Sequence, residues 1–124
     1  MNDLFIPVDT RSETHKVYLY EINYIERRGR QIILKKVDGQ ITYNGSIDHI
    51  SRILDDRFYM CHRSLIVNLE HINSAKNQIL EFINGDSKFI GIHNFRQTRR
   101  AYKQHLEDIF LHRKRTSDIK YKYH

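Results

Sequence analysis

Two dipeptides that favour tight turns, Asp38-Gly39 and Asn84-Gly85, constrain the fold of this chain most strongly. Each lies between runs rich in β-branched and aromatic residues, within NYIERRGRQIILKKVDGQITYNG and ILEFINGDSKFIGI. A two-residue hairpin turn needs backbone conformations that glycine, asparagine and aspartate tolerate best. The sequence therefore predicts two antiparallel β-hairpins, one around each dipeptide.

Other strands are predicted from the alternation of apolar and polar residues. Residues 5–8 form a short strand-like run, and residues 15–22 alternate and are rich in β-branched and aromatic residues. Further along, Leu65 and Val67 face one way and Ile66 faces the other, as in a buried strand. With the two hairpins, these segments make the chain mostly β.

Two helices are predicted from apolar residues at helical spacing. The first is short, about three turns by the 3.6-residue period, and Ser46 is its expected N-cap. The second covers residues 98–112, with Thr98 or Asn94 as its cap. The apolar residues at helical spacing are Ile47, Ile50, Ile53 and Leu54 in the first helix and Tyr102, Leu106, Ile109 and Phe110 in the second.

The excess positive charge is concentrated near the C-terminal end. The 124 residues carry a formal net charge of +6. Residues 1–95 hold twelve Lys or Arg and twelve Asp or Glu, whereas residues 96–124 hold nine and three. We expect one domain, residues 1–112, followed by a flexible basic tail, residues 113–124. Such a charge excess favours an anionic partner.

The sequence offers little for catalysis, metal binding or membrane insertion. Cys61, the only cysteine, precedes His62 on a predicted strand, so their side chains point to opposite faces and do not form a nucleophile–base pair. The chain has no GxSxG, HExxH or phosphate-binding glycine loop. Its apolar runs are too short to span a membrane, and its first residues lack the basic region of a signal peptide. We predict a non-enzymatic, cytoplasmic protein without metal or cofactor.

Three polar patches instead carry the chemistry that nucleic acids require. RRGRQ at residues 27–31 provides guanidinium and amide groups in an expected loop between strands. CHRS at residues 61–64 provides an imidazole, a guanidinium and a hydroxyl at the start of a strand, and IHNFRQTRR at residues 92–100 covers a strand-to-helix transition. Arg forks onto guanine, Asn or Gln onto adenine, and Ser and Arg bind phosphates. Three such patches at loops or strand ends favour nucleic-acid binding.

The same segments resemble the LytTR family of DNA-binding domains. LDDRFYMCHRSLIVNLEHI is similar to the family's short helix, Phe-x-Arg-x-His-Arg/Asn-Ser element and apolar strand ending in Asn. LYEINYIERRGR and FIGIHNFRQTRRAY resemble its upstream strands and the entry to its last helix. The resemblance implies an elongated arrangement of small, mostly antiparallel sheets with a short central helix and a C-terminal helix. It also implies loops that enter successive major grooves, and bent DNA.

The resemblance also implies roles for single residues. Met60 stands where the family motif usually has arginine, and Cys61 has no second cysteine with which to form the disulfide that some relatives use to sense oxidation. The expected base-reading residues are Gln31, Arg63 and His93 or its neighbour Asn94. The expected phosphate-binding residues are Arg28, Arg30, His62, Ser64 and Arg96.

The function expected from these observations is sequence-specific binding of double-stranded DNA by a bacterial transcription regulator. The resemblance is greatest to the DNA-binding half of accessory-gene-regulator-type response regulators. It implies one of two arrangements: a fragment of a response regulator, with a receiver domain and a sensor-kinase pathway outside these 124 residues, or a free-standing regulator. Repeated half-sites would place copies side by side on DNA. Two alternatives stay open: an RNA- or single-strand-binding β module that stacks bases on its eight Tyr and six Phe, and an interaction domain whose basic tail docks on an acidic protein or membrane.

Overall fold

The computed structural model describes the backbone of residues 4–122 and the side chains of residues 4–112. The strands are β1 (Phe5–Asp9), β2 (Thr14–Tyr18), β3 (Ile22–Arg28), β4 (Gln31–Lys36), β5 (Gly39–Asn44), β6 (Phe58–His62), β7 (Leu65–Asn68), β8 (Ile72–Lys76), β9 (Ile79–Phe82) and β10 (Ser87–Phe89). The helices are α1 (Ile47–Ser51) and α2 (Ile92–Lys122), and two short 3₁₀ helices cover Leu19–Glu21 and Leu69–His71.

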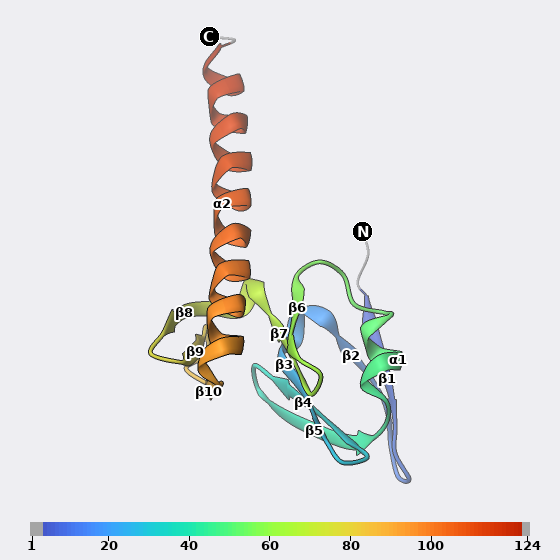
Figure 1. Ribbon diagram of the computed structural model, residues 1–124. Helices are drawn as coiled ribbons and strands as arrows, with labels where there is room; N and C mark the ends of the chain where they lie inside the picture. The colour runs from blue at the N-terminus through green and yellow to red at the C-terminus, as the bar shows by residue number, and fades with distance from the viewer. Residues whose placement is uncertain (1–3, 123–124) are drawn as a thin grey trace.

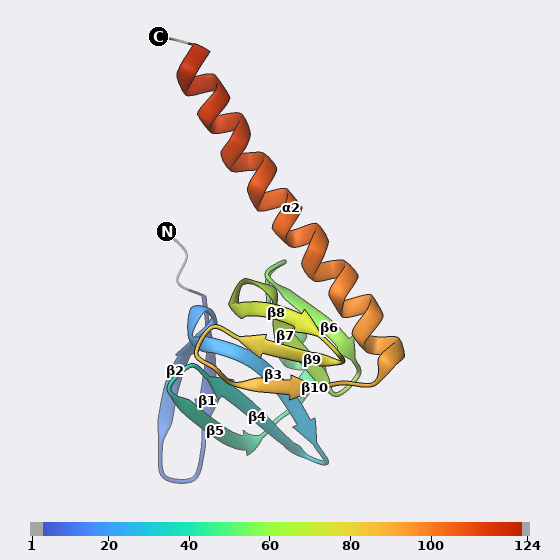
Figure 2. The same ribbon diagram turned by 90° about the vertical axis from the view of Figure 1, so that its left-hand side faces the viewer.

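The strands form three antiparallel sheets, which confirms the predicted fold class. The central sheet has the order β5-β4-β3-β7-β6, and it lies between a β1-β2 hairpin and a small sheet of order β10-β9-β8. Figures 1 and 2 show α2 leaving the small sheet and extending well beyond the strands. The sheets thus build the body, and the long helix projects from it.

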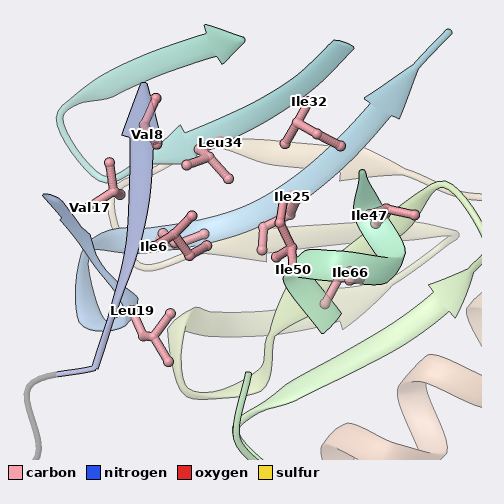
Figure 3. Packing of buried hydrophobic residues seen from close by; sticks show 11 residues of the cluster. Ile6, Val8, Val17, Leu19, Ile25, Ile32, Leu34, Ile47, Ile50 and Ile66 are labelled. Carbon is pink, nitrogen blue, oxygen red and sulfur yellow. The ribbon is translucent and has the colours of Figure 1, made fainter. Parts of the chain in front are cut away.

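The central sheet is buried on both faces, because separate elements cover each side. On one face Ile25 and Ile66 pack with Ile6 of β1 and Ile50 of α1 (Figure 3). On the other face Val67 belongs to a second apolar cluster, formed with the small sheet and the start of α2. Neighbouring residues of β7 therefore lie in different cores, as the alternation of the sequence predicted.

Local turn chemistry accounts for most of the hairpins. The hairpin around Asn84-Gly85 joins β9 to β10 as predicted. The β4–β5 turn lies one residue earlier than predicted, at residues 37–38, and Gly39 opens β5 with a positive φ of 148°. The β8–β9 turn was not predicted, because Asn77 and Gln78 adopt φ values of 54° and 65° without any glycine.

Both helices differ in length from their predictions. In α1, the Ser46 hydroxyl accepts a hydrogen bond from the His49 backbone N–H at 3.3 Å, which confirms the cap, but the helix has only five residues. In α2, both predicted bounds were wrong: the helix begins at Ile92 and continues to Lys122, and Thr98 donates to the Asn94 carbonyl oxygen at 2.8 Å inside it. The flexibility of residues 113–124 stays a prediction, since their side chains lie outside the described residues.

Candidate nucleic-acid interface

The pairing of β3 with β7 brings two of the three polar patches together. These strands are antiparallel neighbours, with Glu26 opposite Leu65, and the Arg27 backbone N–H donates to the Ser64 carbonyl oxygen at 2.9 Å. The turn after β3 and the turn before β7 must therefore lie at the same end of the sheet. Arg63 and Ser64 form the second of these turns.

The third patch is held against the same end by contacts between sheets. Lys88 of β10 lies 2.8 Å from the Glu26 carboxylate and 5.3 Å from the centre of the Tyr24 ring, both on β3. Figure 2 shows the β3–β4 turn, the β6–β7 turn and the junction of β10 with α2 on one side of the molecule. Residues far apart in the sequence therefore share one surface.

The residues predicted to contact DNA line these connections, and none is buried. The exposed side chains are Arg28, Arg30, Gln31, His62, Arg63, His93 and Arg96, and the partly exposed ones are Ser64 and Asn94. Gln31 opens β4, Arg63 lies in the β6–β7 turn, and His93 lies in the first turn of α2. The structure thus brings the three predicted base-reading positions to one side, whereas their roles stay predictions.

The β6–β7 turn presents donors of different kinds. The His62 Nδ1 accepts the Ser64 backbone N–H at 3.2 Å, so in the neutral ring the proton is on Nε2, which is then a donor for an anion. Among the residues described, the Arg63 guanidinium has neither a hydrogen bond nor an ion pair. Met60 is 43 % exposed and provides no donor where the LytTR motif usually has arginine.

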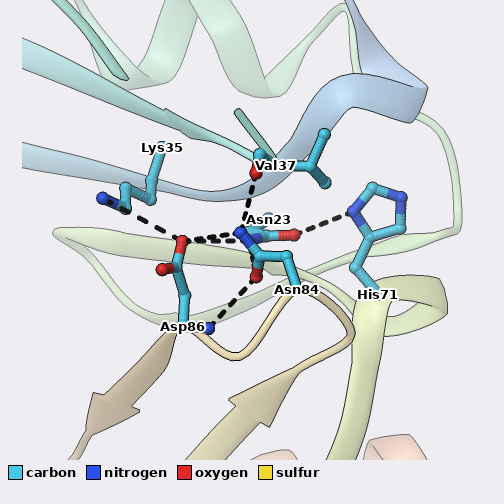
Figure 4. A network of polar contacts seen from close by, with 6 residues as sticks. All are labelled: Asn23, Lys35, Val37, His71, Asn84 and Asp86. Atoms are coloured by element: carbon cyan, nitrogen blue, oxygen red, sulfur yellow. Dashed lines mark hydrogen bonds and ion pairs between the residues drawn. The ribbon is translucent and has the colours of Figure 1, made fainter. Parts of the chain in front are cut away.

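A polar network around the buried Asn23 couples the small sheet to the central sheet (Figure 4). The side chain of Asn23, fully buried in β3, donates to the Asn84 side-chain oxygen at 3.0 Å and lies 3.0 Å from His71 Nδ1. Since the Asn23 amide nitrogen is the donor to Asn84, its oxygen accepts from His71, which places the imidazole proton on Nδ1. Burial lowers the pKa of His71 below its ordinary value, which favours this neutral form. The network continues through Asn84, which donates to the Val37 carbonyl oxygen at 2.9 Å.

Sequence reasoning missed this network because its partners are distant in the chain. Asn23 and Asn84 are 61 residues apart, and Asn23 and His71 are 48 apart. The sequence feature that could have pointed to this network is an asparagine among the apolar residues of a strand. Asn68 is the second example: it is fully buried and donates to the Ile22 carbonyl oxygen at 2.9 Å.

Cys61 lies at the contact between β6 and α2. It is 6 % exposed and packs in the same cluster as Phe95 of the helix. Burial raises the pKa of the Cys61 thiol to about 11, outweighing the lowering effect of a hydrogen bond with Thr98. The thiolate is the reactive form of cysteine, so a buried thiol of high pKa is inert.

We therefore expect Cys61 to be alkylated at least about tenfold more slowly in the folded chain than in the urea-unfolded chain near pH 8, because an unperturbed thiol has a pKa of about 8.5. Iodoacetamide labelling followed by mass spectrometry measures both rates. Equal rates would show that the thiol is accessible and ionised in the fold.

Within the part of the chain that the structure describes, no three His, Cys, Asp or Glu side chains gather as a set of metal ligands. No helix there is both long and apolar enough to cross a bilayer.

Known proteins resemble this chain in sequence and in fold. Residues 12–104 match the family of the LytTr DNA-binding domain. Over 96 residues, the chain is 26 % identical to accessory gene regulator protein A of Staphylococcus epidermidis and 27 % identical to that of Staphylococcus aureus, covering 73 % of this chain and 40 % of each relative. The LytTr DNA-binding domain of a Bacillus cereus response regulator shares the fold, with a TM-score of 0.66 and 21 % identity over 81 % of this chain and 97 % of that chain.

Proposed function

This chain belongs to the LytTR family of DNA-binding domains, as its motifs predicted, and we propose that it binds double-stranded DNA sequence-specifically as the DNA-binding part of a bacterial transcription regulator. The observation that carries this proposal is the gathering of three polar connections on one side of the molecule. An exposed guanidinium, amide and imidazole then face the same partner.

In this proposal, contacts to base edges recognise the DNA sequence and contacts to phosphates hold the duplex. Gln31, Arg63 and His93, with Asn94 beside it, read base edges, and the bidentate fit of arginine to guanine suits the unpaired Arg63. Phosphates are held by the residues around them: Arg28, Arg30, His62, Ser64 and Arg96. Because the readers come from separate connections, we propose that they enter successive major grooves and that the DNA bends to meet them.

The regulatory context is also a proposal. The matched region covers 40 % of the length of the accessory gene regulator proteins. We propose that the domain acts in the cytoplasm, either under a receiver domain and a sensor-kinase pathway as part of a response regulator, or as a free-standing regulator. Repeated half-sites would place two copies side by side on DNA.

The alternative of single-strand or RNA binding has less support in the structure. Base stacking needs aromatic rings exposed along a basic groove. Here Tyr24 and Phe82 pack against each other, with 5.6 Å between ring centres, and Tyr102 packs against the second core. No aromatic residue lies in the β3–β4 or β6–β7 turn, whereas Phe89, at the end of β10 beside the third connection, is 65 % exposed. Stacking therefore does not account for the first two connections.

One experiment tests the proposed function directly. Duplexes are selected from a random pool with the 124-residue chain, and binding of the selected duplex is compared with that of each single strand and the matching RNA at fixed salt. We expect a two-part, direct-repeat consensus and preference for the duplex. Preference for a single strand or for RNA would overturn the proposal in favour of the alternative.

Replacing Arg28 by alanine should weaken binding to all duplexes alike and lower the salt slope, the dependence of log affinity on log salt concentration, by about one unit, as expected for one lost phosphate contact. Arg28 is exposed at the end of β3, and among the described residues it forms an ion pair with Glu26 alone, at 3.3 Å. Fluorescence anisotropy over a salt series measures the slope for target and scrambled duplexes. Arg52→Ala, at the end of α1, is the control, and an unchanged slope for Arg28→Ala would remove Arg28 from the phosphate contacts.

A further inference from the structure

We propose that α2 holds a second DNA-backbone site, formed by Arg99, Arg100 and Lys103 as a continuation of Arg96, and that this basic face binds the duplex flanking the sequence read by the three connections. This inference rests on the proposed function and extends it, since Arg96 alone of the four was expected to touch phosphate. The ligand is the phosphodiester backbone and not the bases, so the site adds affinity and shape dependence but no direct base readout.

The spacing of the four cations places them on one face of the helix. They follow one another at i, i+3, i+4 and i+7, which aligns side chains along two turns. The span from Arg96 to Lys103 is about 10 Å at 1.5 Å per residue. These four side chains line a shallow hollow on the protein surface. The basic face is therefore a continuous strip long enough for more than one phosphate.

The strip faces away from the body of the protein, because the opposite face of α2 is used for packing. Phe95 and Thr98 are buried there, and the Tyr102 hydroxyl donates to the Ile72 carbonyl oxygen at 2.8 Å. Figure 2 shows that α2 begins on the side of the molecule where the three connections lie. A duplex that lies on the connections thus meets the strip if it continues or bends towards the helix.

Among the residues that the structure describes, the cations of the strip are unpaired, unlike several cations in and beside the sheets. Lys36, Arg57 and Lys88 each have a carboxylate within 4.0 Å. Within the described residues, no side-chain hydrogen bond or ion pair is recorded for the four cations of the strip. Like charges four residues apart repel each other and destabilise a helix. A bound polyanion offsets this repulsion, and its phosphates fit the free charges.

The test uses the full 124-residue chain and two duplexes. The short duplex contains only the selected site, and the long duplex adds about one helical turn, roughly 10 base pairs, on each side. The variant Arg99→Gln/Lys103→Gln removes two charges while keeping good helix formers. The matched control, Arg11→Gln/Arg52→Gln, removes the same charge from exposed positions outside α2.

We expect the wild-type chain to bind the long duplex more tightly than the short one, and the α2 variant to lose that advantage. On the long duplex, the ratio of wild-type to variant affinity should fall about tenfold between 50 and 200 mM salt, since two phosphate contacts change the salt slope by about 1.8. On the short duplex, the α2 variant should bind like the control variant. Far-UV circular dichroism verifies that both variants stay folded.

Each other outcome overturns the inference. If the α2 variant loses equal affinity for both duplexes, its charges act only through the overall electrostatic field of the protein. The same conclusion would follow if the control variant also lost the preference for the long duplex. Unchanged binding of the α2 variant would leave the strip without a role in DNA binding. If the wild-type chain selects no duplex at all, the proposed function fails as well, so the two failures are distinguishable.

Discussion

Arg63→Ala should remove most of the discrimination between the selected duplex and a scrambled one, while weak non-specific binding remains. Arg63 lies in an exposed turn without a partner in the described part of the chain, so its guanidinium is free to fork onto a guanine. Such a contact contributes about 1–3 kcal/mol of discrimination, or roughly 5- to 150-fold in relative affinity. Competition gel shifts with both duplexes measure the ratio.

Arg63→Lys separates base reading from charge. Lysine keeps the positive charge but lacks the planar fork of the guanidinium, so we expect lost discrimination with an unchanged salt slope. Arg30→Ala, in the neighbouring β3–β4 turn, is the matched control: it should weaken binding to both duplexes equally. If Arg63→Ala keeps full discrimination, Arg63 has no base-reading role.

Local features of the sequence predicted much of the fold. Turn dipeptides and strand alternation depend on neighbouring residues, so the β9–β10 hairpin and the two faces of β7 were predicted correctly. The β8–β9 turn was missed because Asn77 and Gln78 adopt positive φ without glycine. The start of α2 was missed because an exposed Ile92 and a mostly polar first turn gave no apolar stripe to follow.

The candidate site was predicted in its parts but not in its assembly. Each of the three polar patches was visible as a local cluster, yet their common side of the molecule depends on strand pairing. The pairing of Glu26 with Leu65 sets the first two connections side by side, and the contact of Lys88 with Glu26 brings the third. Only the family resemblance implied this assembly before the structure, because no local pattern encodes which strands become neighbours.

Asn23→Ala should lower the free energy of unfolding by about 1–3 kcal/mol, because it removes a fully buried amide together with the hydrogen bonds that this amide makes between the sheets. The Asn23 side chain is fully buried, and its removal leaves the half-buried His71 N–H without its acceptor, while the exposed Asn84 side-chain oxygen keeps the Asp86 backbone N–H as a donor. Urea unfolding measures the change as a shift of the midpoint at constant slope. His71 and Asn84 lie next to strands of the small sheet, whereas Asn23 lies in the central sheet. The loss of stability therefore tests whether this network joins the small sheet to the central one.

The exposed Asn73 supplies the matched control for that experiment, because it loses the same amide. Its side chain has a single long hydrogen bond to Glu81 at 3.4 Å, so Asn73→Ala should change stability by less than about 0.5 kcal/mol. If the two variants are equally stable, the network is not what couples the sheets. If only Asn23→Ala is destabilised and its affinity for the selected duplex falls too, the position of the β10–α2 connection depends on a buried amide remote from the DNA.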